Sequence, residues 1–213
     1  GTGGILFLDE FPEFSRAALE TLRQPLEERE VTVSRVEASV TYPANFQLVA
    51  AMNPCPCGHF PDRSRCRCTD GQITRYLQKV SGPMLDRIDI CVEASPITYG
   101  DIRSSGNNES SREIRARVEQ ARKIQGERFA GENIRCNGEM SGRHIRKFCW
   151  LGREEEKFME EIFKKLALSA RMHDRILKVA RTTADLAEEE KIRLADLCEA
   201  VSYVKSRDKF WGN

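Results

Sequence analysis

The spacing of apolar residues along the chain changes once, at about residue 100. Before that point the apolar residues form short runs, some of them alternating with polar residues, which is typical of strands. The predicted strands are Ile5–Leu8, Val31–Val36, Ala38–Tyr42, Phe46–Met52 and Ile88–Val92. Because stretches with helical spacing lie between these runs, the first part of the chain is predicted to have an α/β fold.

Two elements of this part can be predicted in more detail. Ser15 is a suitable N-cap for a helix whose apolar residues recur at helical spacing up to the charged segment Glu27–Glu30. The runs at 31–35 and 38–42 favour β structure. They are predicted to pair as a hairpin that turns at 36–37.

The second part of the chain is predicted to be helical throughout. Ser110 and Glu113 have the spacing of a capping box, and the helix that follows carries an apolar stripe on an otherwise charged surface. The stripe consists of Ile114, Val118, Ala121 and Ile124. Further helices are predicted at about 141–150, 154–166, 170–187 and 194–205.

The stretch 99–109 is rich in Gly, Ser and Asn and is predicted to be a linker. The expected organisation is therefore an α/β part at 1–98, a linker at 99–109 and a helical domain at 110–213.

Composition narrows the class of protein only slightly. The chain has 213 residues, of which 31% are charged, and its formal net charge is +1. It contains neither an apolar stretch long enough to cross a bilayer nor the pattern of a signal peptide, so we expect a cytoplasmic protein. A net charge this small neither supports nor excludes binding to nucleic acid, which would require a local basic patch.

An apolar run near the start of the chain ends in two adjacent acids, Asp9 and Glu10. In a P-loop ATPase, carboxylates at such a strand end hold magnesium and orient the attacking water. Alternatively, these acids cap a following helix. The sequence contains no Gly-x-x-x-x-Gly-Lys-Ser/Thr loop and does not begin with Met, so we expect the C-terminal part of a longer ATPase, with half of an ATP site.

Two further polar residues have suitable positions. Asn53 follows the strand at 46–52, where its amide could hydrogen-bond a γ-phosphate and the attacking water, although an Asn before a Pro also forms turns. Arg87 lies between two aspartates before the run at 88–92. It is either part of an intramolecular ion pair or an arginine finger for a neighbouring subunit.

Four of the eight cysteines are crowded together in a Cys-x-Cys, eight-residue, Cys-x-Cys arrangement. These are Cys55, Cys57, Cys66 and Cys68. Four thiolates in two close pairs suit a closed, structural zinc site, with His59 as a possible substitute ligand and disulfides as the competing interpretation. The scattered cysteines are expected to be buried as small apolar residues. They are Cys91, Cys136, Cys149 and Cys198.

Several motifs occur in one order at domain-scale spacing. They are Gly4–Phe11, Asn53–Gly58, Ser81–Asp89, Leu168–Arg171 and Val179–Leu186. In these motifs the chain resembles the C-terminal half of an AAA+ ATPase of the magnesium-chelatase-like group, specifically the ComM/YifB family associated with competence. The resemblance covers most of the chain.

The resemblance implies a fold and a set of roles. The fold is the C-terminal part of a P-loop AAA+ parallel-sheet domain followed by an all-helical lid domain. Asp9 and Glu10 would be the Walker B pair, Asn53 sensor 1, Arg87 the arginine finger and Arg171, at the start of a lid helix, sensor 2. Arg75, close to the same region, could act as an additional arginine for a neighbouring site.

The resemblance also implies partners and cofactors. The parent protein would use ATP and Mg²⁺, assemble into a ring and remodel DNA during recombination or natural transformation. The hairpin at 31–42 would project into the ring pore, with Arg35 near its tip contacting phosphates, unless it is an ordinary surface hairpin.

The family also has an N-terminal Lon-protease-like domain. Because this domain and the P-loop are not in the sequence, the chain alone is expected to bind ATP poorly and to hydrolyse none. One alternative is a motor that acts on a protein or metal-insertion complex, as magnesium chelatase does. The other is a non-catalytic, zinc-bearing assembly module.

Overall fold

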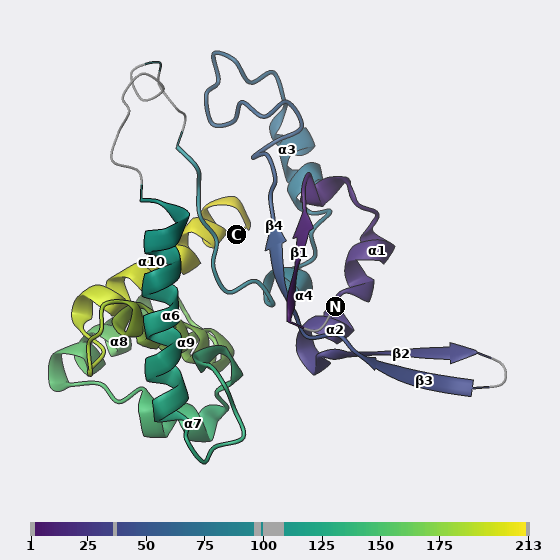
Figure 1. Ribbon diagram of the computed structural model, residues 1–213. Coiled ribbons are helices and arrows are strands. Elements are labelled where there is room, and N and C mark those ends of the chain that lie inside the picture. The colour runs from purple at the N-terminus through teal and green to yellow at the C-terminus, as the bar shows by residue number, and fades with distance from the viewer. Residues whose placement is uncertain (1–2, 36–37, 96–98, 100–108, 212–213) are drawn as a thin grey trace. The chain divides into compact units, whose positions relative to one another are not determined.

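The computed structural model describes residues 3–35, 38–95, 99 and 109–211 (Figure 1). The chain divides into two compact units. The strand unit comprises 1–89 together with 208–213, and the helical unit comprises 90–207. The predicted linker at 99–109 lies outside the described residues except for Tyr99 and Glu109.

The central element of the strand unit is a pair of parallel strands. β1 (Gly4–Leu8) pairs with β4 (Phe46–Ala50), and Leu8 lies opposite Ala50 at the end of the ladder. Both strands were predicted from the apolar runs, and the parallel pairing requires the intervening chain to cross over from one strand to the other.

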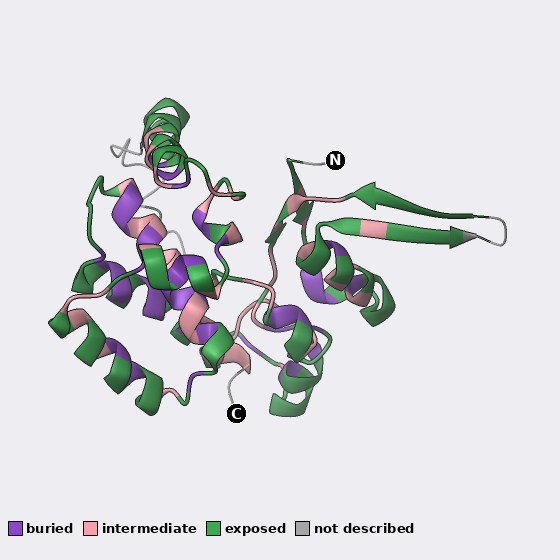
Figure 2. Ribbon diagram, turned by 90° about the horizontal axis from the view of Figure 1, so that it is seen from below, coloured by how far each residue is buried: buried purple, intermediate pink, exposed green. Residues whose placement is uncertain are grey.

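The predicted hairpin is confirmed. β2 (Glu30–Arg35) pairs antiparallel with β3 (Ala38–Pro43), and the turn at 36–37 lies outside the described residues. Its two faces differ. Hydroxyl pairs line one face, with 2.9 Å between the oxygens of each pair, Thr32–Thr41 and Ser34–Ser39. Apolar side chains occupy the alternate positions: Val31, Val33, Val40 and Tyr42. Most of both strands is exposed (Figure 2).

The strand predicted at Ile88–Val92 is wrong. These described residues form no strand, and Ile90 and Val92 are 51% and 74% exposed. An apolar segment becomes a strand only where a neighbouring strand satisfies its backbone amides. Here the Ile88 amide instead donates to the Leu85 carbonyl at 3.0 Å, which closes the turn after a short helix.

Short helices complete the strand unit. They are η1 (Phe11–Glu13), α1 (Arg16–Thr21), α2 (Arg23–Glu28), α3 (Asp70–Leu77) and α4 (Gly82–Leu85). The predicted N-cap is confirmed, because the Ser15 hydroxyl accepts a hydrogen bond from the Ala18 amide at 3.2 Å. The helix expected to run to the charged segment is divided at Leu22. Pro25 has no N–H to donate to the carbonyl of Thr21, which interrupts the helical ladder at that point.

The strand unit buries two small apolar clusters. The first consists of Phe11, Leu19, Val80, Met84 and Leu85. The second consists of Cys55, Cys66, Ile73, Tyr76 and Leu77. Trp211 packs against both clusters and donates from its indole Nε1 to the Leu77 carbonyl at 3.1 Å, so the end of the last helix belongs to this unit.

The helices predicted for the second part are confirmed. They are α6 (Ser111–Arg128), α7 (Gly142–Phe148), α8 (Arg153–Lys165), α9 (Ala170–Leu186) and α10 (Leu194–Trp211). A short helix that was not predicted, η2 (Asn137–Glu139), precedes α7. The capping box is present, because the Glu113 amide donates to the Ser110 hydroxyl at 3.3 Å and the Ser110 amide to the Glu113 carboxylate at 2.7 Å. In the predicted stripe of α6, Ala121 is buried, but Ile114 and Val118 are 43% and 44% exposed.

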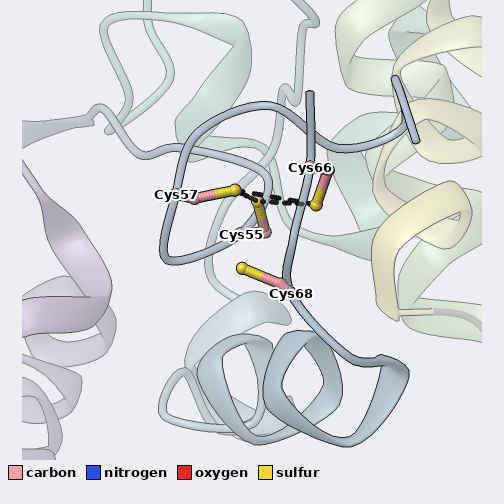
Figure 3. A group of neighbouring side chains, drawn as sticks. All are labelled: Cys55, Cys57, Cys66 and Cys68. Carbon is pink, nitrogen blue, oxygen red and sulfur yellow. Dashed lines mark hydrogen bonds between the residues drawn. The ribbon is translucent and has the colours of Figure 1, made fainter. Parts of the chain in front are cut away.

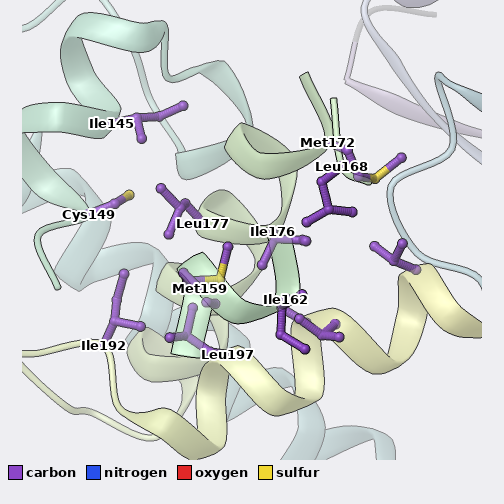
Figure 4. Packing of buried hydrophobic residues seen from close by; sticks show 14 of the residues in the cluster. Ile145, Cys149, Met159, Ile162, Leu168, Met172, Ile176, Leu177, Ile192 and Leu197 are labelled. Carbon is purple, nitrogen blue, oxygen red and sulfur yellow. The ribbon is translucent and has the colours of Figure 1, made fainter. Parts of the chain in front are cut away.

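One large apolar cluster forms the core of the helical unit (Figure 4). It draws side chains from α7 to α10, including Ile145, Met159, Ile176 and Leu197. Among the residues that the structure describes, no helix is both long and apolar enough to cross a bilayer.

The expectation that the scattered cysteines are buried is correct only for Cys149. Cys91 and Cys136 are half-buried, and Cys198 is exposed. Leu197 and Val201 lie on the buried face of α10. Cys198 follows Leu197 and is therefore rotated from it by about 100° around the helix axis. That rotation carries Cys198 away from the core.

A buried polar network lies beside the apolar core of the helical unit. The Asp185 carboxylate, fully buried, accepts hydrogen bonds from Arg128 (2.7 Å to Oδ2), Arg181 (3.1 Å) and the Asn137 amide (2.7 Å). The Arg181 guanidinium also donates to the carbonyls of Glu189 and Glu190 at 2.6 and 2.8 Å. This network joins α6, η2 and α9.

Candidate active site and metal centre

The predicted acids and the predicted amide follow the same edge of the strand pair. Parallel pairing brings the carboxyl ends of β1 and β4 together. Asp9 and Glu10 follow β1 directly, and Asn53 comes shortly after β4. The ladder continues past the strands, because the Ala51 amide donates to the last carbonyl of β1 and the Phe11 amide to the Ala51 carbonyl, both at 2.9 Å.

The backbone presents both acids to solvent at this edge. Glu10 has φ 50° and ψ 45°, a left-handed conformation that is unusual for a residue other than glycine. Phe11 and Pro12, directly after it, are buried and fix the end of the turn. The Asp9 carboxylate accepts from the Glu10 amide at 2.9 Å, and the Glu10 side chain makes no capping hydrogen bond to η1. Glu10 therefore does not have the helix-capping role that was the alternative interpretation.

Asn53 is exposed and lies against a glycine of the cysteine loop. A Cβ placed on Gly58 would be 3.7 Å from both Cγ and Oδ1 of Asn53. Gly58 has φ +78°, a conformation that favours glycine. Burial raises the pKa of Tyr76, and the Asn53 backbone partly offsets that effect.

The four crowded cysteines converge (Figure 3). Cys55 and Cys57 follow β4, Cys66 and Cys68 precede α3, and all four Sγ atoms lie within 4.8 Å of one another. The sulfur separations are 3.4 Å (Cys55–Cys57), 3.6 Å (Cys57–Cys66) and 3.8 Å (Cys55–Cys66).

These separations can be compared with the two chemistries that the sequence left open. Four sulfurs at the Zn–S distance of about 2.3 Å in a tetrahedron are about 3.8 Å apart, whereas a disulfide requires about 2.05 Å. The cysteines are free thiols in the structure. The arrangement therefore fits a tetrahedral metal ion and not a pair of disulfides.

The surroundings of the sulfurs affect the individual cysteines differently. The Phe60 amide donates to the Cys55 Sγ at 3.4 Å, and a backbone hydrogen bond from His59 is the main reason that the pKa of Cys57 falls to about 6. Burial raises the pKa of Cys66, and it raises that of Cys68 to about 11. His59, the possible substitute ligand, is not in the group of ligand atoms formed by the described residues.

The loop that carries the cysteines is tied to the start of α3. Arg63 donates to the Cys68 carbonyl at 3.1 Å and pairs with Asp70. Its guanidinium also lies 5.0 Å from the centre of the Phe60 ring. Thr69 caps α3 in a capping box. These contacts hold the second cysteine pair close to the helix.

The two candidate arginine fingers differ in exposure. Arg87 pairs with Glu27 of α2 and donates to the Pro83 carbonyl, and only 10% of its side chain is exposed. The ion pair considered for Arg87 is therefore present, and its finger role stays a prediction. Arg75 is exposed on α3, and its side chain makes no hydrogen bond or ion pair with any residue that the structure describes.

Two predicted site residues, Arg171 and Arg35, do not follow the strand ends of β1 and β4 in the sequence. Arg171 is an exposed residue in the first turn of α9, in the helical unit, where the Ser169 hydroxyl caps the helix by accepting from the Met172 amide at 3.2 Å. Arg35 ends β2 and has its backbone opposite Ala38, next to the turn. Both roles stay predictions.

Sequence reasoning missed Tyr76 and Gly58 as neighbours of Asn53. The signal for α3 was present, since Ile73, Tyr76 and Leu77 have helical spacing after a capping residue. The packing of this helix under the cysteine loop depends on how the loop folds, which the spacing does not reveal.

Comparison with known families covers nearly the whole chain. Residues 1–102 match the family model of magnesium chelatase, subunit ChlI. Residues 108–204 match the model of the C-terminal part of magnesium chelatase, subunit ChlI.

Individual relatives match over almost all of this chain. The competence protein ComM of Haemophilus influenzae is 44% identical over 203 residues, 95% of this chain and 39% of ComM. The protein YifB of Escherichia coli is 45% identical over 202 residues, 94% of this chain and 39% of YifB. The chain thus spans about two fifths of the length of these relatives.

Proposed function

Because this chain belongs to the ComM/YifB family of magnesium-chelatase-like proteins, we propose that it is part of an AAA+ ATPase that couples ATP hydrolysis to the remodelling of DNA. The observation that carries the ATPase proposal is the shared edge of β1 and β4, where Asp9, Glu10 and Asn53 follow paired parallel strands. In α/β folds this edge is where ligands bind.

Each residue of this edge has a role in the proposal. The exposed Asp9 carboxylate offers the oxygen ligands that Mg²⁺ prefers. The bound Mg²⁺ would neutralise charge on the phosphates. Glu10 orients and polarises the attacking water, and the Asn53 amide hydrogen-bonds the γ-phosphate and that water.

Arginines supply positive charge from other parts of the assembly. Arg171 is proposed as sensor 2. Arg87 is proposed as the finger that acts on a neighbouring subunit in a ring, with Arg75 as a second candidate because of its exposure and lack of partners among the described residues.

The hairpin is the proposed contact with DNA. Its exposed ladder of Ser and Thr hydroxyls can donate hydrogen bonds to phosphate oxygens irrespective of base sequence. Arg35, at the end of β2, would add a charge at the tip. The name of the relative ComM, a competence protein, supports DNA as the substrate.

A structural zinc ion is proposed for the four cysteines. The donor set is all sulfur, the separations of 3.4–3.8 Å among Cys55, Cys57 and Cys66 are close to those of a tetrahedron, and a fourth sulfur leaves no open position for catalysis. The metal would therefore stabilise the loop.

A second candidate function is a motor that acts on a protein or metal-insertion complex. Both family models bear the description of a magnesium chelatase subunit, which favours this alternative. The two candidates share one ATPase and differ in what stimulates it.

The test is ATP hydrolysis by a full-length protein that includes a P-loop, with and without single-stranded and branched DNA. We expect turnover that DNA stimulates and that falls as salt rises, because phosphate contacts are salt-dependent. Glu10→Gln should lower turnover by roughly 100-fold or more without loss of ATP binding. Turnover that ignores DNA would support the chelatase-like alternative, and no turnover in the wild type would refute the ATPase.

The arginine roles can be separated with Arg75→Ala and Arg87→Ala in the same protein. Loss of a trans-acting arginine should lower turnover by about 1,000-fold while ATP still binds. The finger should also be rescued by mixing with Glu10→Gln subunits, since each mixed interface then combines one intact arginine with one intact Walker B pair. Absence of rescue for both variants would exclude a role in a neighbouring site.

A further inference from the structure

The segment between Asn53 and the metal centre is very short. Only Pro54 separates Asn53 from Cys55, and a proline ring restricts its own φ to about −65°. Cys55 is fully buried. A shift of Cys55 would therefore be transmitted to Asn53 with little freedom for the backbone to absorb it.

The loop also contacts the Asn53 side chain directly. Gly58 follows Cys57 and lies against the Asn53 carboxamide. The Gly58 amide donates to the Cys55 carbonyl at 3.0 Å, so this turn includes two of the four sulfur-bearing residues. Asn53 is thus bordered by residues whose positions follow from the geometry of the cysteine pair.

Tyr76 is the third residue in the surroundings of Asn53. It is 6% exposed and belongs to the same cluster as Cys55 and Cys66, against which Met52, the residue before Asn53, also packs. Residues 61–65 are exposed, so this part of the loop is held by polar contacts, such as those of Arg63 with Cys68 and Asp70, and not by burial. A metal ion on the four sulfurs would hold the loop against Tyr76 and so complete the surroundings of Asn53.

We propose that the four-cysteine metal centre is a positioning device for Asn53, and that Tyr76 is a second positioning residue for the same amide. The functional consequence is that zinc controls the rate of ATP hydrolysis and not the binding of ATP. This consequence rests on the proposed ATPase function. The structural part of the inference, the dependence of Asn53 on the metal, can be tested without any activity.

The structural test uses NMR of the 213-residue chain before and after removal of zinc with a chelator. The side-chain amide signals of Asn53 should shift and broaden, and readdition of Zn²⁺ should restore them. The Asn137 amide, buried in the helical unit, should stay unchanged. The Trp211 indole, bonded to the Leu77 carbonyl, should also persist as a sign that the strand unit is still folded.

Two results would overturn this part of the inference. One is an Asn53 signal that does not respond to the loss of zinc. The other is simultaneous loss of the Trp211 signal, which would mean that the metal maintains the whole unit and does not act on Asn53 in particular.

The functional test uses the full-length protein with Cys66→Ser, and with Cys198→Ser as the matched control at an exposed cysteine outside the centre. Cys66→Ser should lose zinc and lower kcat by about 100-fold, as expected for a misplaced catalytic group. The Kd for ATP should change less than about twofold, because binding is proposed to be spared. Cys198→Ser should match the wild type.

A double-mutant cycle separates positioning from general damage. If the metal acts through Asn53, Cys66→Ser combined with Asn53→Ala should be no slower than Asn53→Ala alone. Tyr76→Phe, which keeps the ring, should retain zinc and lower kcat by about tenfold. Additive losses, or weaker ATP binding in step with kcat, would refute the inference. If the wild type hydrolyses no ATP, the proposed function fails, and the NMR result still decides whether zinc positions Asn53.

Discussion

Different interactions stabilise the interior of each of the two units. The helical unit has one apolar cluster shared by α7 to α10 and a buried carboxylate beside it. The strand unit has two smaller clusters, an exposed hairpin and a loop that brings four sulfurs together. Apolar burial can account for the first unit, whereas in the second the region next to the candidate active site is built around four converging cysteines, the proposed zinc site.

The two units also differ in whether their carboxylates are buried or exposed. In the helical unit, Asp185 is fully buried and forms ion pairs with both Arg128 and Arg181. The buried carboxylate therefore has charged partners. Burial lowers the pKa of Arg181, but Asp185 opposes that effect. In the strand unit, Asp9 and Glu10 remain exposed at the edge, available to a ligand. Removal of one partner from a buried pair destabilises a fold, whereas exposed acids can bind a ligand.

Removal of zinc is expected to have the largest effect and to be confined to the strand unit. Structural zinc sites contribute on the order of 10 kcal/mol of apparent binding free energy. Purified chain should contain about one equivalent of zinc. Hydrogen exchange should show that chelation exposes the amides of Phe60 and Cys66, which donate to Cys55 Sγ and the Asp62 carbonyl.

The buried amides of α9 serve as the internal control for that measurement. Faster exchange in α9 after chelation would contradict the separation of the two units. A zinc content below about half an equivalent would count against the four-sulfur site itself.

Asp185→Ala should have the next largest effect, in the helical unit. It leaves two guanidinium groups without their buried partner, and breaking a buried pair costs about 3–5 kcal/mol. Urea unfolding followed by the helical circular dichroism signal measures this loss. Asp174→Ala is the control on the same helix, where the carboxylate is 44% exposed, and it should change stability by less than about 0.5 kcal/mol. Equal losses for the two variants would show that burial of Asp185 does not matter.

The smallest effect on stability is expected in the hairpin. Thr32→Ala removes one of the paired hydroxyls, a cross-strand interaction worth about 0.2–1 kcal/mol. Stimulation of ATP hydrolysis by DNA should nevertheless fall in the full-length protein, and Val33→Thr on the opposite face serves as the comparison. A loss of several kcal/mol from Thr32→Ala would mean that the hairpin is packed against other residues.

Local patterns predicted much of the fold. Ser15 and Ser110 were identified as helix caps because capping depends on residues three positions apart. The hairpin followed from two adjacent runs. The cysteine cluster followed from spacing alone, since two Cys-x-Cys pairs bring four sulfurs into one loop.

Features that depend on distant residues were not predictable. The ion pair between Arg87 and Glu27 joins residues far apart in the chain, and no local pattern indicates it. The run at Ile88–Val92 has the composition of a strand but lacks a paired neighbour among the described residues. Tyr76 was missed for the same reason, because its proximity to Asn53 arises from the folded loop.

The position of Trp211 affects the order in which the two units can fold. The strand unit is discontinuous, because 208–213 join 1–89 only after the whole of 90–207 has been translated. The helical unit has its complete core before then and can fold while the nascent chain is still growing. During that interval β1, β4 and the cysteine loop lack the indole that packs against both small clusters. Of the two units, the one with the candidate active site is therefore completed after the helical unit, although residues 1–89 precede the helical unit in the chain.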